Sequence, residues 1–391
     1  MIWVWSAVVL APAILLLGYA YGLYPAILAL LTPTKPPETR EPPSEWPQVT
    51  VILPAYNEEA SIGATLEAIL ALDYPPDRRH VLVVSDASTD RTDDIVQGYA
   101  NRGVHLVRMP VRRGKTAAEN AARPHFRGDI IVNTDASVRL ARESLKPLVA
   151  AMLDAQVGVA SGRDVSVTRN HGDANVAESG YVDYEMWVRS LETRAGGIVG
   201  ASGCFFASRA VLHQEIVPEA LSRDFAAPII AQEHGYRSVS VPEAICYVPR
   251  TASLTAEYRR KVRTMARGLE TLWYKRHLMN PFKHGRFAWM LCSHKLARWL
   301  VPPAALLAGV GLVVLGAAEE AARWYVVALS GSVAGVAGLA WYAPPGSLPR
   351  PVAVVGYVIW GVIAGLHAWI KALRGELNPV WEPTRRQSGV G

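Results

Sequence analysis

The stretch Gly128-Asp-Ile-Ile-Val-Asn-Thr-Asp-Ala-Ser-Val138 carries a predicted β-strand that ends in an acid. Its residues Ile130, Ile131 and Val132 are β-branched and apolar, which favours a strand buried on both faces. Asp135 follows where the apolar run stops. In an open α/β sheet, ligands bind outside the carboxyl ends of the strands, so Asp135 is a candidate ligand of a divalent cation. The competing interpretation is that Asp135 caps the turn that follows.

Residues 48–250 alternate between strand and helix patterns. Apolar runs bounded by turn residues predict strands, and three- and four-residue apolar spacing predicts the helices between them. Such alternation implies an α/β domain with a doubly wound, mostly parallel sheet and helices on both faces. The predicted strands are Val49–Leu53, His80–Val84, Val104–Arg108, the run from Ile130, Val157–Val167 and Cys204–Ala207, and the predicted helices are Ile62–Leu70, Asp90–Tyr99, Gly114–Ala122 and Val176–Thr193.

The apolar excess of the chain lies at its two ends. Of the 391 residues, 50% are hydrophobic. Residues 1–31 are expected to be a retained transmembrane anchor, because no Lys or Arg precedes the apolar run and no small-residue cleavage site follows it. Residues 291–375 contain three more apolar segments, each long enough to cross a bilayer: Leu296–Ala317, Trp324–Tyr342 and Val352–Ile370. We therefore expect a multi-pass protein of the inner or plasma membrane.

Charges beside the apolar segments bear on the topology. Lys35 and Arg40 lie in a Pro-rich linker, 32–47, directly after the anchor. The positive-inside rule then places the domain at 48–250 in the cytoplasm. Four spans would put the polar tail, 376–391, outside, whereas Lys371 and Arg374 favour the inside. One re-entrant segment would resolve this conflict, and the number of spans stays open.

Residues 251–290 are predicted to form an amphipathic helical region on the membrane surface. Between Thr255 and Leu278, apolar residues recur at helical spacing while Lys and Arg cover the remaining faces. The net charge of +6 fits anionic lipid head groups and a phosphate-bearing substrate. No nucleic-acid-binding motif accompanies it, so membrane lipids rather than nucleic acid are the expected partners. The three cysteines show neither zinc-ligand nor disulfide spacing.

Acids and small polar residues follow successive predicted strands. Glu58 follows the first strand, Asp86 and Asp90 the second, and Asp135 the fourth. Their convergence at one sheet edge predicts a ligand crevice. Taken singly, Glu58 and Asp90 fit helix N-caps, whereas Asp86 can accept hydrogen bonds from a base or sugar. Lys115 begins a predicted helix, where the dipole disfavours a cation, so either a nearby ligand anion or a solvated surface position is expected.

These motifs, taken in order, resemble glycosyltransferase family 2. The flanking anchor, the interfacial helix and the terminal spans resemble its membrane-bound synthase branch. That branch includes cellulose, chitin-oligomer, hyaluronan and poly-N-acetylglucosamine synthases and, more distantly, ceramide glucosyltransferases. The matching segments are Val51–Glu59, Val84–Thr92, Gly114-Lys115 with Asn120, Asn133–Ser137, Gly200–Gly203, Ser222–Phe225, Glu233–Arg237 and Arg260–Arg263.

The resemblance implies a GT-A fold, a UDP-sugar donor and inverting transfer to a β-linked product. It makes Asp224 the general base for the acceptor hydroxyl and Asp135 the ligand of Mg²⁺ or Mn²⁺. On the residues alone, Asp224 is first an N-cap, and Arg260 and Arg263 are lipid head-group contacts. The implied donor-binding residues are Tyr56, Asn57, Glu58, Asp86, Lys115, Asp135, Arg260 and Arg263, and the implied acceptor-side residues are Ser202 and Gly203.

Three positions depart from the family pattern. Ser137 stands where the second acid of the metal-binding Asp-x-Asp is usual, and Arg223 replaces the acid that usually precedes the base. Thr264 stands where the processive synthases carry tryptophan. These departures bear on the metal site, the acceptor site and long-chain synthesis respectively.

The resulting hypothesis is a membrane-embedded, metal-assisted, inverting transferase that moves sugar from a UDP-sugar to a growing glycan. The alternatives are single-sugar transfer to a lipid (ceramide, diacylglycerol or polyprenyl phosphate) and a non-catalytic membrane subunit that binds a nucleotide sugar. Four spans barely enclose a channel, so an extruding pore would need an export partner or a homo-oligomer.

Overall fold

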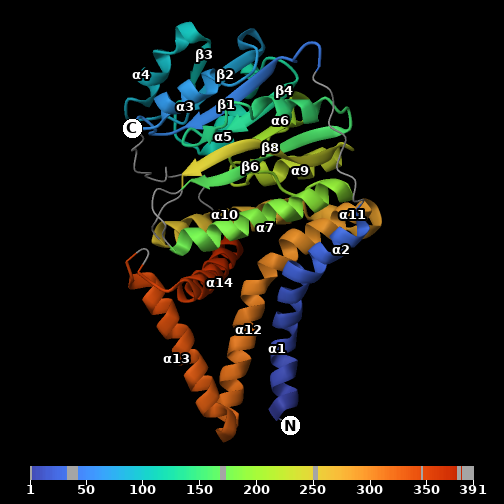
Figure 1. Cartoon of the computed structure of the whole chain (residues 1–391), viewed down its shortest axis with the longest axis vertical. Helices are drawn as coiled ribbons and strands as arrows, with labels where there is room; N and C mark the ends of the chain where they lie inside the picture. Colours follow the sequence, from blue (N-terminus) through green and yellow to red (C-terminus); the bar gives the residue numbers. More distant parts are fainter. Residues whose placement is uncertain are drawn as a thin grey trace. The chain divides into compact units, whose positions relative to one another are not determined.

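The computed structural model describes residues 2–32, 43–167, 173–249, 254–344, 347–376 and 380. The chain divides into two compact units (Figure 1). The sheet unit comprises Thr32–Thr168 and Val182–Arg250, and the helical unit comprises Met1–Leu31, Arg169–Tyr181 and Thr251–Glu376. Most of the predicted linker at 32–47 and of the predicted tail at 376–391 lies outside the described residues.

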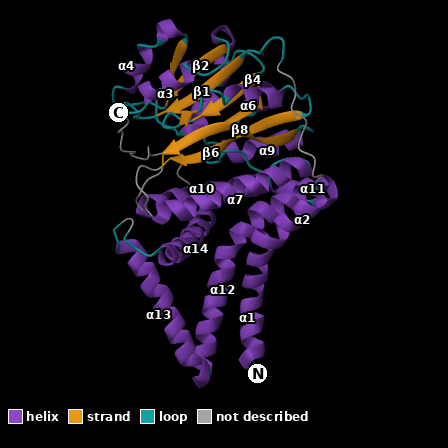
Figure 2. Cartoon of the chain, in the orientation of Figure 1, coloured by secondary structure: helices purple, strands orange, loops and turns teal. Residues whose placement is uncertain are grey.

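The sheet unit is built on one eight-stranded sheet, in the order β3-β2-β1-β4-β7-β6-β8-β5 (Figure 2). β1 pairs in parallel with β2 and β4, and β2 with β3. β7 runs antiparallel to β4 and β6, so the sheet is mixed. The α/β fold class is confirmed. The strands are β1 Val49–Ala55, β2 Arg79–Ser85, β3 Val104–Arg108, β4 Ile130–Thr134, β5 Arg139–Leu140, β6 Val157–Val167, β7 Phe205–Arg209 and β8 Arg237–Pro249.

Helices cover both faces of this sheet because its central strands are apolar on both sides. Every residue of β1 is buried. Val51 and Leu53 face one core, which is shared with α3 (Ile62–Leu70), α4 (Thr92–Gln97) and α6 (Leu145–Met152). Ile52 faces a second core with α5 (Lys115–Ala121). A third core joins β6 and β7 to α8 (Ala210–His213) and α9 (Arg223–Glu233).

The sequence patterns did not identify β5, α6 or β8, although β8 is the longest strand of the sheet. β8 pairs in parallel with β6, with a register shift that sets Ser161 opposite Ser240 and Arg163 opposite Ile245. Pro242 lies within the extra β8 residues at this irregularity. Because proline cannot donate a ladder hydrogen bond, it occurs in strands at such irregular positions, where it also interrupts the apolar alternation that would reveal the strand.

The strand order places a topological switch point between β1 and β4. From β1 the chain moves outward to β2 and β3 on one side, and then crosses to β4 on the other. At such a point the loops that leave the two central strands diverge and open a crevice. The loop after β1 carries Tyr56 to Glu58, and the loop after β4 begins at Asp135.

Among its described residues, the helical unit contains four helical runs that are long and apolar enough to cross a membrane, namely Leu10–Leu31, Pro281–Ala318, Glu320–Tyr342 and Arg350–Arg374. The first run lies within the expected anchor at 1–31, and the other three include the three C-terminal segments expected from sequence. Their helices are α1 Ile2–Gly18, α2 Tyr24–Leu31, α11 Pro281–Leu291, α12 Ala297–Ala318, α13 Glu320–Tyr342 and α14 Arg350–Arg374, with π-helical turns at Tyr19–Leu23 and Cys292–Leu296. α10 (Leu254–Tyr274) is the predicted amphipathic helix, and α7 (Asp173–Ala195) is shared by the two units.

Small residues let the helices of this unit approach one another closely. A side chain at Gly365 of α14 would meet Pro302 of α12, and one at Gly356 would meet Ala340 of α13. A side chain at Gly268 of α10 would overlap Trp299 of α12. Close backbone approach of this kind is how helices associate in lipid, where apolar side chains gain little from mutual burial.

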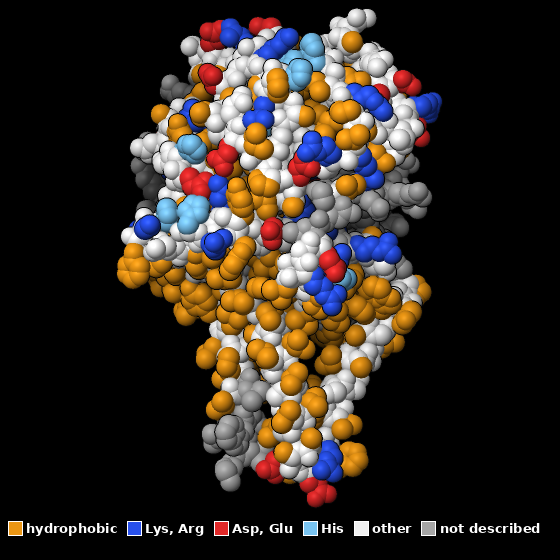
Figure 3. Space-filling model, turned by 180° about the vertical axis from the view of Figure 1, so that it is seen from behind, with side chains coloured by type: hydrophobic (Ala, Val, Ile, Leu, Met, Phe, Trp, Pro, Cys, Tyr) orange, Lys and Arg blue, Asp and Glu red, His pale blue; other side chains and the backbone are white. Residues whose placement is uncertain are grey.

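The outward surface of the helical unit is apolar. No described side chain of α13 is buried. In the space-filling view, hydrophobic side chains cover the helices, and charged side chains gather at the tip where α12 turns into α13 (Figure 3). Glu319, Glu320 and Arg323 lie in that turn. An apolar surface of this extent is typical of protein that contacts lipid.

Gly128 is expected to be essential for stability. It precedes β4 with φ +78°, and a Cβ there would overlap the carbonyl oxygen of Gln48. We predict that Gly128→Ala lowers the melting temperature of the purified protein far more than Gly103→Ala. Gly103 has φ +82° but open space around it, so its substitution costs only the backbone strain, about 1 kcal/mol. Equal shifts in the two variants would refute the steric account.

His80 is expected to make stability depend on pH. Burial, assisted by the charges of Arg127 and His105, lowers the pKa of His80 to about 4. Below pH 6.5 His80 is therefore protonated in the unfolded chain but stays neutral in the folded chain. The contribution of neutral His80 to the free energy of unfolding is fully present above pH 6.5 and is lost as the pH falls toward 4. At pH 5 the loss is about 2 kcal/mol. Denaturant unfolding at pH 7 and pH 5 gives the free energy of unfolding at each pH. The difference between the two values should be smaller in His80→Gln than in wild type. It should stay as in wild type in His277→Gln, a control at an exposed histidine.

Candidate active site

Asn57 joins the loops that leave β1 and β2. Its φ of 52° lies in the left-handed region, which asparagine tolerates better than most residues. The Asn57 side-chain oxygen accepts a hydrogen bond from the backbone amide of Thr89 at 2.8 Å, and the backbone amide of Asn57 donates to Ser88 Oγ at 3.2 Å. These bonds hold the two loops side by side at the carboxyl edge of the sheet.

Asp90 and Glu58 belong to the same pair of loops. The Asp90 carboxylate accepts from the backbone amide of Thr92 at 2.9 Å, but the N-cap residue of α4 is Arg91, so Asp90 lies one residue before the expected capping position. The Glu58 amide donates to Thr92 Oγ1 at 2.8 Å, and the Glu58 carboxylate accepts from Ser61 Oγ at 2.5 Å. Glu58 is thereby buried and held at the carboxyl edge of the sheet.

Asp86 orients the loop between β3 and α5. Its two carboxylate oxygens accept from the backbone amides of Arg113 and Gly114, each at 2.7 Å. Gly114 has φ 98°, a conformation that favours glycine. Each carboxylate oxygen has two lone pairs, so Asp86 retains acceptor capacity for a nucleobase or ribose while it holds this loop.

Tyr56 and Arg112 form a flat stack at the same edge of the sheet. The Arg112 guanidinium carbon lies 3.7 Å from the centroid of the Tyr56 ring. Such a cation–π pair orders two otherwise mobile side chains from different loops. It presents planar surfaces of the kind that pack against a nucleobase.

Lys115 and Asp135 form the central contact of the site. Lys115 is the first residue of α5, and its Nζ donates to Asp135 Oδ1 at 2.5 Å and to the carbonyl oxygen of Gly203 at 2.9 Å. The lysine is therefore neither a solvated surface residue nor dependent on a ligand for its partner. Burial opposes its charge, but the carboxylates of Asp135, Glu119 and Asp224 prevail and raise the pKa of Lys115 above its ordinary value.

Asp224 approaches this contact from α9. It lies in the first turn of the helix, where the dipole stabilises a carboxylate, and Ser222 is the N-cap residue. Ser222 Oγ donates to Asp224 Oδ1 at 2.5 Å. A Cβ on Gly203 would lie 2.9 Å from Asp224 Oδ2, so the absence of a side chain at Gly203 leaves room for this carboxylate.

Ser202 fixes the loop before β7. It is buried, donates to Asp164 Oδ1 at 2.5 Å, and accepts from the Phe205 amide at 3.2 Å. These contacts shape the loop that presents Gly203 to Lys115 and Asp224. The acceptor-side roles of Ser202 and Gly203 stay predictions.

Nine of the eleven sequence-predicted site residues belong to the sheet unit. Contacts bring Lys115, Asp135, Gly203 and Asp224 directly together. Arg260 and Arg263 belong to α10 in the helical unit, so their donor contacts stay predictions. Within α10, the Arg260 guanidinium pairs with both carboxylate oxygens of Glu257, at 2.8 and 2.7 Å.

Sequence reasoning missed two buried residues beside this site, Glu119 and His213. Glu119 lies one helical turn after Lys115 and pairs with Arg223, and His213 contacts Asn133. The available signal for Glu119 was an acid in an otherwise small and apolar helix face, four residues from a lysine. His213 had no such signal, because a lone histidine in a short helix is common.

A divalent cation fits this site only with help from a substrate. Among the described residues, no group of three or more His, Cys, Asp or Glu side chains converges to hold a metal. Asp135 offers hard carboxylate oxygens of the type that Mg²⁺ and Mn²⁺ prefer, and Ser137 offers a hydroxyl nearby in the chain. Mg²⁺ is commonly bound by one or two carboxylates, with water and substrate phosphates completing the shell. The residues thus fit a cation completed by a diphosphate.

Comparison with known sequences identifies the central part of the chain. Residues 50–216 match the family described as glycosyl transferase family 2. An N-acetylglucosaminyltransferase of Mesorhizobium japonicum is 28% identical over 251 residues, which is 58% of each chain. A beta-monoglucosyldiacylglycerol synthase of Synechocystis is 36% identical over 108 residues, which is 27% of this chain and 22% of the relative. The chain therefore spans less than two thirds of these curated relatives.

The same architecture occurs in a solved structure. The mannosyltransferase PcManGT from Pyrobaculum calidifontis, in complex with GDP-Man and Mn²⁺, matches with a TM-score of 0.72 and 25% sequence identity. The match covers 94% of this chain and 99% of that chain, so it extends over both units. The GT-A architecture of the sheet unit is thereby confirmed.

Metal binding is expected to require a nucleotide. Because Lys115 occupies one oxygen of Asp135 and no three-ligand cluster exists among the described residues, we predict no saturable binding of Mn²⁺ alone by isothermal titration calorimetry. Binding should appear when UDP or GDP is present and should disappear in Asp135→Asn.

The matched control is Asp73→Asn, at an exposed carboxylate paired with Lys146, which should retain nucleotide-dependent binding. Tight Mn²⁺ binding without nucleotide, or full binding in Asp135→Asn, would exclude Asp135 as a metal ligand completed by the diphosphate.

Proposed function

We propose that this chain, whose residues 50–216 form a glycosyltransferase family 2 domain, is a membrane-embedded inverting transferase. It moves sugar from a nucleoside-diphosphate sugar, in the first instance a UDP-sugar, onto a growing glycan in β linkage. The observation that carries the proposal is the convergence of Lys115, Asp135 and Asp224 at the switch point of the sheet. The Lys115 ammonium and the Asp135 carboxylate, a candidate metal ligand, lie near the Asp224 carboxylate there.

The donor side of the reaction requires neutralisation of a departing diphosphate. The Lys115 ammonium is held charged by surrounding carboxylates and can donate to phosphate oxygens. Mg²⁺ or Mn²⁺ on Asp135, when bound, supplies Lewis-acid stabilisation of the leaving group. We expect Glu58, Asp86 and the Tyr56–Arg112 stack to bind the nucleoside, and their contacts hold them at the carboxyl edge of the sheet.

The acceptor side requires a base. Asp224 takes the proton of the acceptor hydroxyl as that oxygen bonds to the anomeric carbon of the donor sugar. The bond between this carbon and the phosphate oxygen breaks, and its electron pair leaves with the nucleoside diphosphate. One direct displacement inverts the configuration, so an α-linked donor gives a β-linked product. Gly203 has no side chain, so the Asp224 carboxylate can lie close to the loop before β7, where we expect the acceptor hydroxyl.

The helical unit favours an acceptor handled at the membrane. The four apolar runs found among its described residues suit a bilayer, and the relative named N-acetylglucosaminyltransferase makes N-acetylglucosamine a candidate for the transferred sugar. The relative named beta-monoglucosyldiacylglycerol synthase supports the second candidate, one sugar transferred to a lipid. Lys35 and Arg40 favour a cytoplasmic sheet unit, where nucleotide sugars are made available.

The nucleotide of the donor has one specific rival. The structure of PcManGT contains GDP-Man, and the likeness extends over almost the whole chain. Guanine and uracil both carry ring N–H groups, and the Asp86 carboxylate can accept a hydrogen bond from either. UDP-sugars and GDP-mannose are therefore tested together.

Asp224→Asn is predicted to lower turnover by about 10²- to 10⁴-fold, because the amide cannot take the acceptor proton. The measurement is nucleotide release by the full chain in lipid nanodiscs, with UDP-N-acetylglucosamine, UDP-glucose or GDP-mannose, and with Mn²⁺ or chelator. Asp73→Asn is the control and should turn over as wild type does.

Unchanged turnover in Asp224→Asn would remove Asp224 as the base. An inactive wild type with every donor would favour the non-catalytic membrane subunit instead. Mass spectrometry of the products separates the two acceptor classes, since a ladder of oligosaccharides supports the glycan acceptor and a single sugar on an extracted lipid supports the second candidate.

A further inference from the structure

Arg223 is a buried cation directly before the proposed base, and the reaction above leaves it without a role. It is only 4% exposed, and its Nε faces Glu119 Oε2 at 3.6 Å. Glu119 is 1% exposed. Two charges removed from water in this way are costly, and the removal of either partner would leave the other buried and uncompensated.

The pair connects the two helices that carry the reacting groups. Glu119 lies on α5, one turn after Lys115, and Arg223 is the first residue of α9, next to Asp224. Asn120 reinforces the connection, since its side-chain oxygen accepts from Arg223 and its Nδ2 donates to the carbonyl oxygen of Val217 at 2.8 Å. The chain before α9 is therefore tied to α5 at two places.

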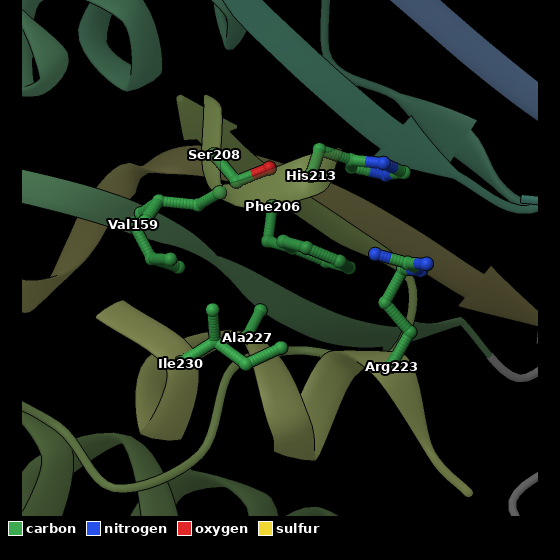
Figure 4. A pocket seen from close by; sticks show the side chains of 8 residues that line it. Val159, Phe206, Ser208, His213, Arg223, Ala227 and Ile230 are labelled. Atoms are coloured by element: carbon green, nitrogen blue, oxygen red, sulfur yellow. The ribbon is translucent and has the colours of Figure 1, made fainter. Parts of the chain in front are cut away.

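A small cavity beside Arg223 extends the connection to β4. It is lined by Ser208, His213 and Arg223 among apolar side chains, and it is about the size of one water molecule (Figure 4). In Figure 4 the Arg223 guanidinium and the His213 ring lie at the same end of the cavity. Within the described chain, Ser208 Oγ, His213 Nδ1 and Arg223 Nε are buried without a hydrogen-bond partner.

The bonding capacities of these three groups suit one water molecule. Burial, with the Arg223 charge, lowers the pKa of His213, so the ring is neutral. His213 Nε2 contacts Asn133 Oδ1 at 2.9 Å, which leaves Nδ1 as an acceptor. A water in the cavity would accept from Arg223 Nε, donate to His213 Nδ1 and bond to Ser208 Oγ. Asn133 lies two residues before Asp135 on β4.

We propose that Glu119, Arg223, His213 and Asn133, joined by this one buried water, form a positioning network beneath the active site. Each of the three reacting groups lies within four residues of a network member: Lys115 of Glu119, Asp224 of Arg223, and Asp135 of Asn133. The network fixes the distance between the base and the donor-side charges. This inference rests on the proposed function for its catalytic consequence, but its structural consequence is measured without turnover.

The first experiment is hydrogen exchange followed by mass spectrometry on the full chain in nanodiscs. Arg223→Met should accelerate exchange at least tenfold at the start of α9, in peptides covering 222–226, and should also accelerate it at 115–119. The control is Arg79→Met, which removes another buried arginine, one whose guanidinium donates to the carbonyls of Leu70 and Leu72. It should leave exchange at 222–226 unchanged even if it lowers the melting temperature.

The second experiment separates positioning from stability. The double variant Arg223→Met/Glu119→Leu replaces the ion pair with apolar side chains, so it should recover most of the melting temperature that Arg223→Met loses. Nucleotide release should nevertheless stay at least tenfold below wild type in both variants, and the KM for the donor should stay within twofold of wild type. The reason is that apolar packing does not fix the orientation of the two helices as the ion pair does. Arg79→Met should turn over as wild type does.

Two results would overturn the proposal. One is unchanged exchange at 222–226 in Arg223→Met, and the other is recovery of turnover together with melting temperature in the double variant, which would make the pair purely structural. If the wild type releases no nucleotide from any donor, the proposed function fails, while the exchange data still decide whether the network holds α9 to α5.

Discussion

The contact between Lys115 and Asp135 is the interaction on which the site depends. A cation at the start of a helix is disfavoured by the helix dipole, and an acid at the tip of β4 would be repelled by the nearby carboxylate of Asp224. Each charge is acceptable because the other lies 2.5 Å away. The Gly203 carbonyl also accepts a hydrogen bond from this ammonium. Four segments therefore meet at one point: the loop after β4, the loop before β7, and the starts of α5 and α9.

The sheet explains why these segments meet. β1 and β4 are neighbours although the chain visits β2 and β3 between them, so the loops after β1 and β4 leave the sheet at its switch point, where ligands commonly bind. Asn57 and Asp86 hold adjacent loops through their hydrogen bonds, and Asp90 bonds to the first residue of α4. These polar residues thus bond largely to one another, and we propose that a substrate diphosphate completes the region around Lys115 and Asp135.

Patterns in the sequence were sufficient for the parts of the fold that repeat a simple period. The β-branched run at Ile130–Thr134 and the apolar face of α3 are examples, because burial on one or both faces leaves a direct trace in the residue order. β8 escaped prediction since Pro242 sits at a register irregularity. For the site, strand-end acids marked Asp86 and Asp135, but the pairing of Glu119 with Arg223 depends on how α5 and α9 pack across about a hundred residues of chain, which no local pattern records.

We propose a single-displacement transferase in which Asp224 activates the acceptor and the Lys115–Asp135 site receives the leaving group. The most direct test is the configuration of the product, followed at the anomeric proton of the transferred sugar by NMR during turnover in nanodiscs. The account predicts that an α-linked nucleotide sugar gives a β-linked product from its first appearance. An α-linked product, which requires retention through a different mechanism, would contradict it.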